Sequence, residues 1–202
     1  MRALLPIDAE TPRSLVINPP LTDSEFEAIC LGSEWFRYER TREGEILMHP
    51  PAGGFTGRGN AEITAQLHSW WRAHRRGSVF DSSTGFFLPD RSILNPDAAF
   101  VLPHKLKGLQ KDDLTGFPRL CPDFVIELIS SSDSLPKAQE KMDRWLENGA
   151  ALGWLIEPYQ RQVYVHEPKC ETRIVSGPEI RGKGPVEGFI LDLEELWRCY
   201  EV

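Results

Sequence analysis

The sequence predicts a mixed α/β fold in which a central β-sheet is flanked by helices, and three observations carry this prediction. Residues 124–129 form a nearly continuous apolar run, which is typical of a strand buried on both faces. An amphipathic stretch follows at 135–148, and a second apolar run follows at 153–157. A strand, a helix and a strand at this spacing indicate a right-handed crossover between parallel strands, so the sheet is at least partly parallel.

The length and composition indicate one globular domain. The chain has 202 residues, of which 41% are hydrophobic and 26% charged, and this composition excludes disordered and coiled-coil proteins. Residues 1–20 contain four prolines and no periodic pattern. We therefore expect an N-terminal arm at 1–20 and a single domain at 21–202.

The first half of the domain combines short helices and a hairpin. Thr22 and Glu25 form a capping box before a small helix. Aromatic and polar residues alternate on either side of a Glu-Gly turn at 43 and 44, which predicts a hairpin. Residues 59–76 have the apolar spacing of a long amphipathic helix that ends in the basic run Arg-Ala-His-Arg-Arg.

The remaining segments predict further strands around the crossover. Short strands are expected at 78–81, 84–88 and 97–102, and the polar, glycine-containing stretch at 103–119 predicts a surface loop. Residues 161–168 are expected to pair as a hairpin with the second apolar run of the crossover. The rest of the chain indicates short strands and a terminal helical turn.

Charge and cysteine spacing exclude several function classes. The net charge of −7 argues against binding of nucleic acid over the whole surface, although a local basic groove remains possible. The four cysteines are widely spaced, with no C-x-x-C pair, and the histidines form no compact ligand pair, so no structural zinc or His-rich metal site is indicated. No signal peptide and no long apolar run is present, so we expect a cytoplasmic protein with no membrane partner.

Three ionisable residues stand where a purely structural sequence would not place them. Glu127 interrupts the first apolar strand, and burial of an unpaired carboxylate costs several kcal/mol unless it is neutralised, paired or bound to a metal. Asp97 opens the short apolar strand Pro-Asp-Ala-Ala-Phe-Val, and Lys141 flanks the buried stripe of the helix at 135–148. Taken singly, each has a structural explanation: a buried ion pair for Glu127, turn chemistry for Asp97 and an ordinary surface position for Lys141.

Together the three residues suit a divalent metal site for phosphodiester hydrolysis. Magnesium takes one or two carboxylates and completes its shell with water and substrate phosphate. A nearby lysine would orient or activate the attacking water, or stabilise charge on the phosphate. Asp123 shares the strand face of Glu127 at a distance of about 13 Å, and Glu62 flanks the long helix, where it could assist a second metal. Both are supporting candidates. The simpler interpretation is a structural acid for Asp123 and a solvated helix glutamate for Glu62.

Two other chemistries find little support. The glycines of 50–60 would suit a phosphate loop, but G-K-[ST] and G-x-G-x-x-G are both absent, so a flexible loop over the site is the simpler interpretation. Ser83 and the serines at 130–132 lack the setting of a nucleophile elbow, which excludes a serine hydrolase of that type.

Six motifs along the chain form a specific ordered set. They are GEILMHPP (44–51), TGFFLPD (84–90), NPDAAFV (95–101), CPDFVIELISSSDS (121–134), the K-x-x-x-W-x-x-x-G of Lys141, Trp145 and Gly149, and GWLIEP (153–158). In sequence and spacing this set resembles the Uma-two family, a large bacterial group described as restriction endonucleases. The resemblance covers roughly residues 20–198.

The resemblance implies a restriction-endonuclease-like core of the PD-(D/E)xK type, with Mg²⁺ or Mn²⁺ as cofactor and DNA as substrate. It makes Asp97 the acid of the PD motif and Glu127 the acid of the following strand motif. The sequence departs from the general nuclease pattern at Ile129, where a lysine would stand, and the resemblance assigns that role to Lys141. A second departure lies at 52–60, where the family often has a histidine and this chain has Phe-Thr-Gly-Arg.

Three function classes remain open. The first is a metal-dependent endonuclease in which Asp97 and Glu127 bind the metal, Lys141 assists the water and the basic run contacts DNA phosphates. The second is a binding or regulatory module that keeps the fold but is catalytically weak or inactive. A homodimer is expected, with the N-terminal arm as a possible contact. The third, a two-carboxylate glycosidase, ranks last because most tryptophans fall at core positions.

Overall fold

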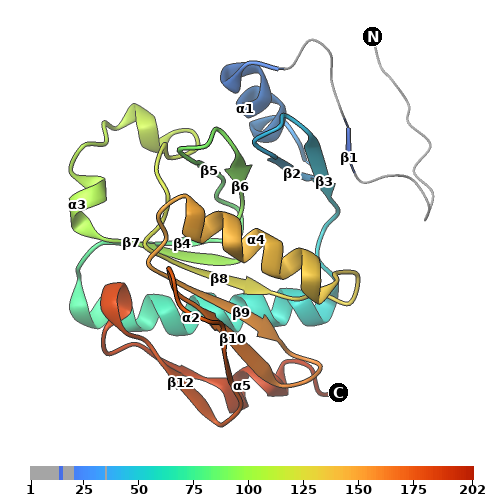
Figure 1. The fold of residues 1–202 in the computed structure, drawn as a ribbon, viewed down its shortest axis with the longest axis vertical. Coiled ribbons are helices and arrows are strands. Elements are labelled where there is room, and N and C mark those ends of the chain that lie inside the picture. Colours follow the sequence, from blue (N-terminus) through green and yellow to red (C-terminus); the bar gives the residue numbers. More distant parts are fainter. Residues whose placement is uncertain (1–13, 16–20, 35) are drawn as a thin grey trace.

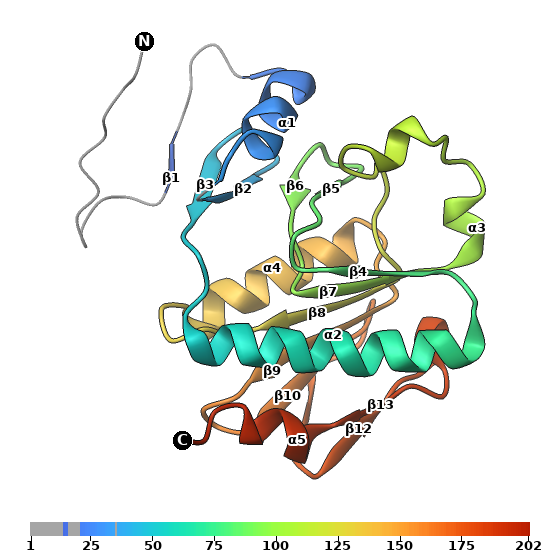
Figure 2. The same ribbon diagram turned by 180° about the vertical axis from the view of Figure 1, so that it is seen from behind.

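The computed structural model describes residues 14–15, 21–34 and 36–202, so the expected N-terminal arm lies outside the described residues except for Ser14–Leu15. Figures 1 and 2 show a central sheet between helices, and the predicted mixed α/β class with a mixed sheet is confirmed. The central sheet has the order β11-β10-β9-β8-β7-β4. Its strands are β4 (Ser78–Asp81), β7 (Ala98–Val101), β8 (Phe124–Leu128), β9 (Leu152–Glu157), β10 (Gln162–His166) and β11 (Arg173–Val175).

The predicted crossover lies at the centre of this sheet. Strands β8 and β9 are parallel and are connected by α4 (Leu135–Glu147), whereas β7 and β10 pair with them antiparallel. Because β8 has a neighbour on each side and a helix over each face, all its residues are buried, as its apolar sequence predicts.

Alternating side chains of β8 form two separate cores. Phe124 and Ile126 belong to the core that packs against α2 (Gly54–His74). Val125 belongs to the core that contains Met142 and Trp145 of α4. Glu127 shares the parity of Val125, so its side chain points toward α4. The two helices therefore lie on opposite faces of the sheet, as Figures 1 and 2 show from the two sides.

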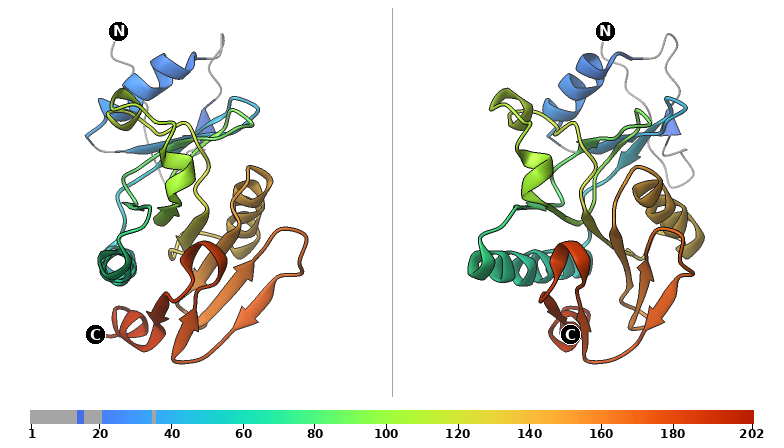
Figure 3. Two further views of the ribbon diagram at one scale, coloured as in Figure 1. Left: turned by 90° about the vertical axis from the view of Figure 1, so that its left-hand side faces the viewer. Right: turned by 60° about the vertical axis from the view of Figure 1, so that its left-hand side comes forward.

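A second, five-stranded sheet with the order β1-β3-β2-β6-β5 lies over one end of the molecule (Figure 3). It carries α1 (Asp23–Leu31), whose predicted capping box is present and whose Phe26 is fully buried. The predicted hairpin is confirmed as β2 and β3, with Arg40 opposite Ile46. The strands of this N-terminal sheet are β1 (Ser14–Leu15), β2 (Arg37–Arg40), β3 (Ile46–His49), β5 (Phe86–Phe87) and β6 (Ile93–Leu94).

The C-terminal elements cover the α2 side of the central sheet. Strands β12 (Glu179–Arg181) and β13 (Ile190–Asp192) form a two-stranded sheet, followed by α5 (Leu193–Arg198). A short helical turn, η2 (Gly184–Val186), lies between β12 and β13. Their apolar residues complete the core beneath α2. Within the described ranges, no helix is long and apolar enough to cross a membrane.

Two expected loops contain helical structure. Helix α2 begins at Gly54 and not at residue 59, so most of the glycine-rich stretch is helical. The glycine at 59 serves close packing, since a Cβ there would lie 2.8 Å from Leu128 Cδ2 and 2.9 Å from the Tyr200 hydroxyl. The expected surface loop at 103–119 contains α3 (Pro103–Leu106) and a helical turn, η1 (Asp112–Leu114). Proline at the first helical position favours α3, because its fixed φ suits a helix start.

Candidate active site

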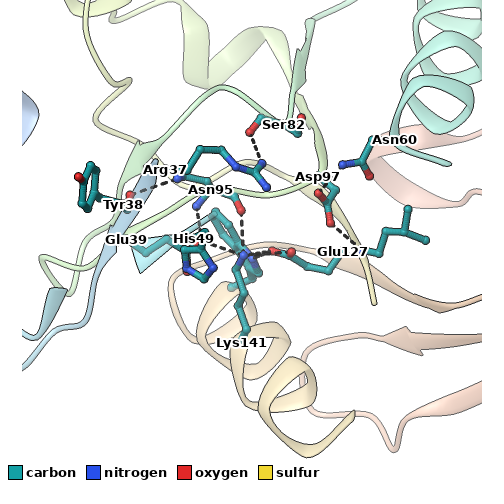
Figure 4. A network of polar contacts seen from close by, with 12 residues as sticks. Arg37, Tyr38, Glu39, His49, Asn60, Ser82, Asn95, Asp97, Glu127 and Lys141 are labelled. Atoms are coloured by element: carbon teal, nitrogen blue, oxygen red, sulfur yellow. Dashed lines mark hydrogen bonds and ion pairs between the residues drawn. The ribbon is translucent and has the colours of Figure 1, made fainter. Parts of the chain in front are cut away.

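Asp97, Glu127 and Lys141 come together in one cavity of about 850 Å³. Asp97 directly precedes β7, Glu127 lies on β8 and Lys141 lies on α4 (Figure 4). The pairing of β7 with β8 brings Asp97 close to Glu127, because the Asp97 backbone amide donates to the carbonyl of the neighbouring residue Ile126 at 3.0 Å. The crossover helix then brings Lys141 over the face to which Glu127 points.

The Asp97 carboxylate is fixed by two donors from different elements. Its Oδ2 accepts a hydrogen bond from the Leu128 backbone amide at 2.8 Å, and its Oδ1 accepts one from Nδ2 of Asn60 on α2 at 2.9 Å. Burial raises the pKa of Asp97, against the opposing effect of the Lys141 charge and the Leu128 amide. The side chain is therefore held in one position in an environment that disfavours its negative charge.

Glu127 is more deeply buried, with 7% of its surface exposed. Its Oε1 accepts a hydrogen bond from the Trp145 indole at 2.8 Å, and its Oε2 accepts one from Lys141 Nζ at 3.0 Å. Burial raises the pKa of Glu127 to about 8, even though Lys141 opposes this shift, and the negative charges of Asp97 and Glu39 add to it.

Lys141 is held by three acceptors. Besides Glu127, its Nζ contacts Oε1 of Glu39 at 2.8 Å and the Asn95 backbone carbonyl at 2.8 Å. Burial lowers the pKa of Lys141, but the carboxylates of Glu127 and Glu39 outweigh burial and raise it above the usual range of a lysine. The ammonium thus stays charged, which suits it to stabilising negative charge and to orienting water, and not to accepting a proton.

Glu39 on β2 is part of the site, although nothing in the sequence pattern marks it. It is 3% exposed, and it accepts hydrogen bonds from the Asn95 backbone amide at 2.9 Å and contacts His49 Nε2 at 3.3 Å. Burial raises the pKa of Glu39, but Lys141 and His49 outweigh burial and hold the pKa below its usual range. Glu39 has the parity of Arg37 on a strand with alternating aromatic and polar residues, so the local pattern assigns it to solvent. Its burial comes with its contacts to Lys141 on α4 and to Asn95 in the loop before β7, both distant in the sequence.

The donor set fits a divalent cation. Three acidic side chains, those of Glu39, Asp97 and Glu127, surround the single ammonium of Lys141, and the raised pKa of Glu127 reflects too little positive charge for all three, which a divalent cation would supply. Each carboxylate oxygen has two lone pairs, so both Asp97 and Glu127 keep acceptor capacity beyond their present hydrogen bonds. Among the described residues, no group of three His, Cys, Asp or Glu side chains forms a ready-made metal cage. Two carboxylates with water and phosphate are the ligands that Mg²⁺ commonly takes in enzymes.

The supporting candidates lie elsewhere. Asp123, just before β8, accepts a hydrogen bond from the Leu102 amide at 2.8 Å and pairs with Lys105 at 3.0 Å. Glu62 accepts a hydrogen bond at 2.9 Å from Gln66, one turn further along α2. Within the described chain, neither side chain is among those that line the cavity. The structure therefore gives both acids local partners and does not bring them to Asp97 and Glu127.

The position of Lys141 can be understood from Ile129. Ile129 is 4% exposed and packs in the α4-side core, two residues after Glu127 and on the same face. A lysine at 129 would thus approach Glu127 from its own strand, whereas Lys141 reaches Glu127 from the helix that covers this face. Lys141 thus provides an ammonium at Glu127 from the helix in place of the strand.

Comparisons with known proteins place the chain in a family. The model of the Uma2 family, described as "Putative restriction endonuclease", matches residues 23–194. No curated protein matches the chain. Among solved structures, the chain is similar to one from Anabaena variabilis, described as "a putative nuclease belonging to DUF820", with a TM-score of 0.71 and 22% identity over 89% of this chain and 99% of that one. At this identity the likeness shows the fold alone, and it agrees with the expected mixed central sheet flanked by helices. Because the family match spans most of the sequence, the chain belongs to the Uma2 family, the one that its ordered motifs resemble.

Proposed function

We propose that the protein is a metal-dependent endonuclease that hydrolyses phosphodiester bonds of DNA. The observation that carries this proposal is the convergence of Asp97, Glu127 and Lys141 in one cavity, where the pKa values of both acids are raised and a divalent cation would favour their charged forms. Perturbed acids in a cavity are typical of catalytic sites. The family description and that of the structural neighbour are both of nucleases.

Each residue has a distinct part in the proposed reaction. Asp97 and Glu127 would hold Mg²⁺ or Mn²⁺, which supplies charge neutralisation at the phosphate and lowers the pKa of bound water. Asn60 and the Leu128 amide keep Asp97 in place, and the Trp145 indole does the same for Glu127. The charged Lys141 orients the attacking water and stabilises the negative charge that develops on the phosphate.

A catalytically weak or inactive binding module is the alternative. The observation that favours it is the ion pair of Lys141 with both Glu127 and Glu39, because a metal at Glu127 shares that carboxylate with the ammonium. The net charge of −7 also opposes tight DNA binding.

The first test is cleavage of supercoiled and single-stranded DNA with Mg²⁺ or Mn²⁺. We expect Glu127→Gln and Lys141→Met each to lower the cleavage rate at least about 100-fold, because the first removes a proposed metal ligand and the second removes the charge that acts on the reacting phosphate. Glu147→Gln, which removes an exposed carboxylate from α4, is the matched control and should cut like wild type.

Three outcomes of this test are informative. Loss of activity in both variants, with Mn²⁺ binding lost in Glu127→Gln by calorimetry, supports the endonuclease. Equal cleavage by all variants identifies a contaminant and contradicts it. Metal binding to wild type without turnover favours the binding module.

The proposal extends to assembly and location. A homodimer would cut both strands and convert supercoiled plasmid to linear DNA, whereas a monomer would accumulate nicked circles; light scattering of the full chain gives the mass directly. All four cysteines are free, which suits a reducing compartment such as the cytoplasm.

A further inference from the structure

The mouth of the active-site cavity carries aromatic side chains that the proposed reaction does not use. Phe55, in the first turn of α2, and Tyr159, in the turn between β9 and β10, both line the cavity that contains Asp97 and Glu127. Phe55 is 41% exposed and Tyr159 is 54% exposed. Large aromatic residues at this exposure leave ring surface available to a ligand within reach of the candidate metal site.

The two rings are held in place by a third. Tyr200 stacks on Phe55, with ring centroids 5.9 Å apart and an interplanar angle of 16°, and it meets Tyr159 edge to face at 5.7 Å and 79°. The Tyr159 amide donates to Glu157 at 2.9 Å, and Arg58 donates to two carbonyls of the C-terminal segment that carries Tyr200. The exposed rings are therefore preorganised, so a ligand that packs on them loses little affinity to side-chain ordering.

We propose that Phe55 and Tyr159 stack against an unpaired nucleobase of the strand whose phosphate lies at Asp97 and Glu127. This inference rests on the proposed nuclease function and names its substrate class, single-stranded or locally unpaired DNA. Aromatic side chains beside a phosphate site are the usual means of binding single strands without sequence preference, because every base offers a stacking face.

The dimensions and charges of the cavity agree with this substrate. A cavity of about 850 Å³ has the size of a small-molecule site, so it admits nucleotides but not the body of a duplex. Lys137 and Arg144 of α4 line the same cavity and offer positive charge to the phosphates on either side of the stacked base. A paired base would remain in its own stack and leave both aromatic rings without a partner.

The experiment measures binding to the full chain in EDTA, so that no cleavage takes place. Fluorescence anisotropy compares a labelled single-stranded oligonucleotide with a blunt duplex of the same sequence. We expect the single strand to bind more tightly, and Phe55→Ala and Tyr159→Ala each to weaken its binding roughly tenfold with little effect on the duplex. Tyr159→Phe keeps the ring and should bind like wild type. Ile174→Ala, at an exposed apolar residue of β11, is the matched control.

A change in the DNA tests the same contact from the other side. An oligonucleotide of the same length in which every position is abasic keeps the phosphates but offers no base, so it should bind wild type more weakly than the intact strand, and this difference should be smaller for Tyr159→Ala. Because Phe55 packs on Tyr200, thermal melting of each variant and the milder Phe55→Leu separate a lost contact from a lost fold. Equal affinity for both DNA forms, or alanine variants that bind the single strand like wild type, would overturn the inference.

Failure of this inference and failure of the nuclease proposal look different. Metal-dependent cleavage of duplex DNA, with no effect of Phe55→Ala or Tyr159→Ala on any substrate, keeps the nuclease and overturns the stacking site. Stacking on the single strand without cleavage under any metal condition keeps the stacking site and overturns the nuclease.

Discussion

Lys141 shows how neighbouring carboxylates determine the chemistry that one side chain can perform. Two carboxylates and a carbonyl surround its ammonium, and the carboxylates raise its pKa above the usual range. A lysine in this setting acts through its charge. Of these two carboxylates, that of Glu39 is not a proposed metal ligand. A substitution of Glu39 therefore changes the surroundings of Lys141 and leaves Asp97 and Glu127 in place.

We expect Glu39→Gln to lower kcat about 10- to 100-fold and to leave the Kd for Mn²⁺ nearly unchanged. The amide can still accept from the Asn95 backbone, but it removes the charge that holds Lys141, and a hydrogen bond to a charged group contributes about 1.5–3 kcal/mol. Single-turnover cleavage and calorimetry with Mn²⁺ measure the two effects. Glu43→Gln, at an exposed position of the same hairpin, is the control, and a parallel loss of metal binding would contradict a role through Lys141.

The sequence can predict some of these residues because they break a strong local pattern. Glu127 interrupts a buried strand, and Lys141 flanks a buried helical stripe, so both stand out on their own elements. Glu39 and Asn60 follow the polar positions of ordinary amphipathic elements, and their burial arises from contacts over long sequence distances. No pattern within one element records such contacts.

Two acids, one just before β8 and one on it, have different partners. Asp123 before its first residue pairs with Lys105, and Glu127 near its end pairs with Lys141. The four-residue spacing gives both side chains the same face but separates them by about 13 Å. The strand therefore connects a structural ion pair to the candidate active site.

We expect Asp123→Ala to lower the free energy of unfolding by about 2 kcal/mol, because it leaves the Leu102 amide and the partly exposed Lys105 without their acceptor. Urea unfolding measures this loss. Cleavage per folded molecule should stay at the wild-type level. A loss of cleavage at unchanged stability would instead place Asp123 in the catalytic machinery.

Helix α1 provides a prediction about pH. The hydrogen bond from Arg40 lowers the pKa of Asp23 below its ordinary value of 3.8, burial opposes this, and Arg119 adds to the lowering. Because the folded-state pKa is lower than the unfolded-state value, the contact stabilises the protein above the unfolded pKa, and this stabilisation disappears as the pH falls through the folded pKa. In urea unfolding, Asp23→Asn should be less stable than wild type at about pH 7, and the difference should shrink below about pH 4. A difference that is constant with pH would contradict this account.

The start of α2 shows where prediction from sequence becomes unreliable. Glycines and prolines before residue 59 indicate a loop, yet the helix begins at Gly54. Glycine at 59 is required by the close approach of Leu128 and Tyr200, which lie on distant segments of the chain. A glycine inside a helix for tertiary packing and a glycine in a loop have the same local signature.

The candidate site lies between the N-terminal sheet and the central sheet with its helix α4. β2 supplies Glu39, the loop before β7 supplies Asp97, and α4 supplies Lys141, so residues from both sheets surround one cavity. The crossover that forms the centre of the fold could be predicted because strand, helix and strand follow one another locally. The assembly of the second sheet around its hairpin could not, because β5 and β6 are two residues each and β6 pairs with β2, more than 50 positions earlier in the sequence.

The net charge of −7 restricts how the molecule could hold a duplex, because it opposes association with the negatively charged phosphates. Arg72 and Arg76 are exposed at the C-terminal end of α2, and Arg72 lies twelve residues after Asn60, about 18 Å along the helix. That distance is about five base pairs of duplex, so under the proposed nuclease function these arginines would lie near phosphates that flank the cleaved bond.

We expect the double variant Arg72→Gln, Arg76→Gln to bind duplex DNA more weakly and with a lower salt dependence. Each lost phosphate contact reduces the slope of log K against log salt concentration by about 0.9, so the two together should reduce it by about 1.8. Anisotropy titrations of a labelled duplex at several NaCl concentrations measure this slope. Arg181→Gln, Lys183→Gln removes the same charge from the region of β12, where both cations are paired with carboxylates, and it should leave the slope nearly unchanged. If both double variants reduce the slope equally, the effect comes from net charge, and the end of α2 makes no specific phosphate contact.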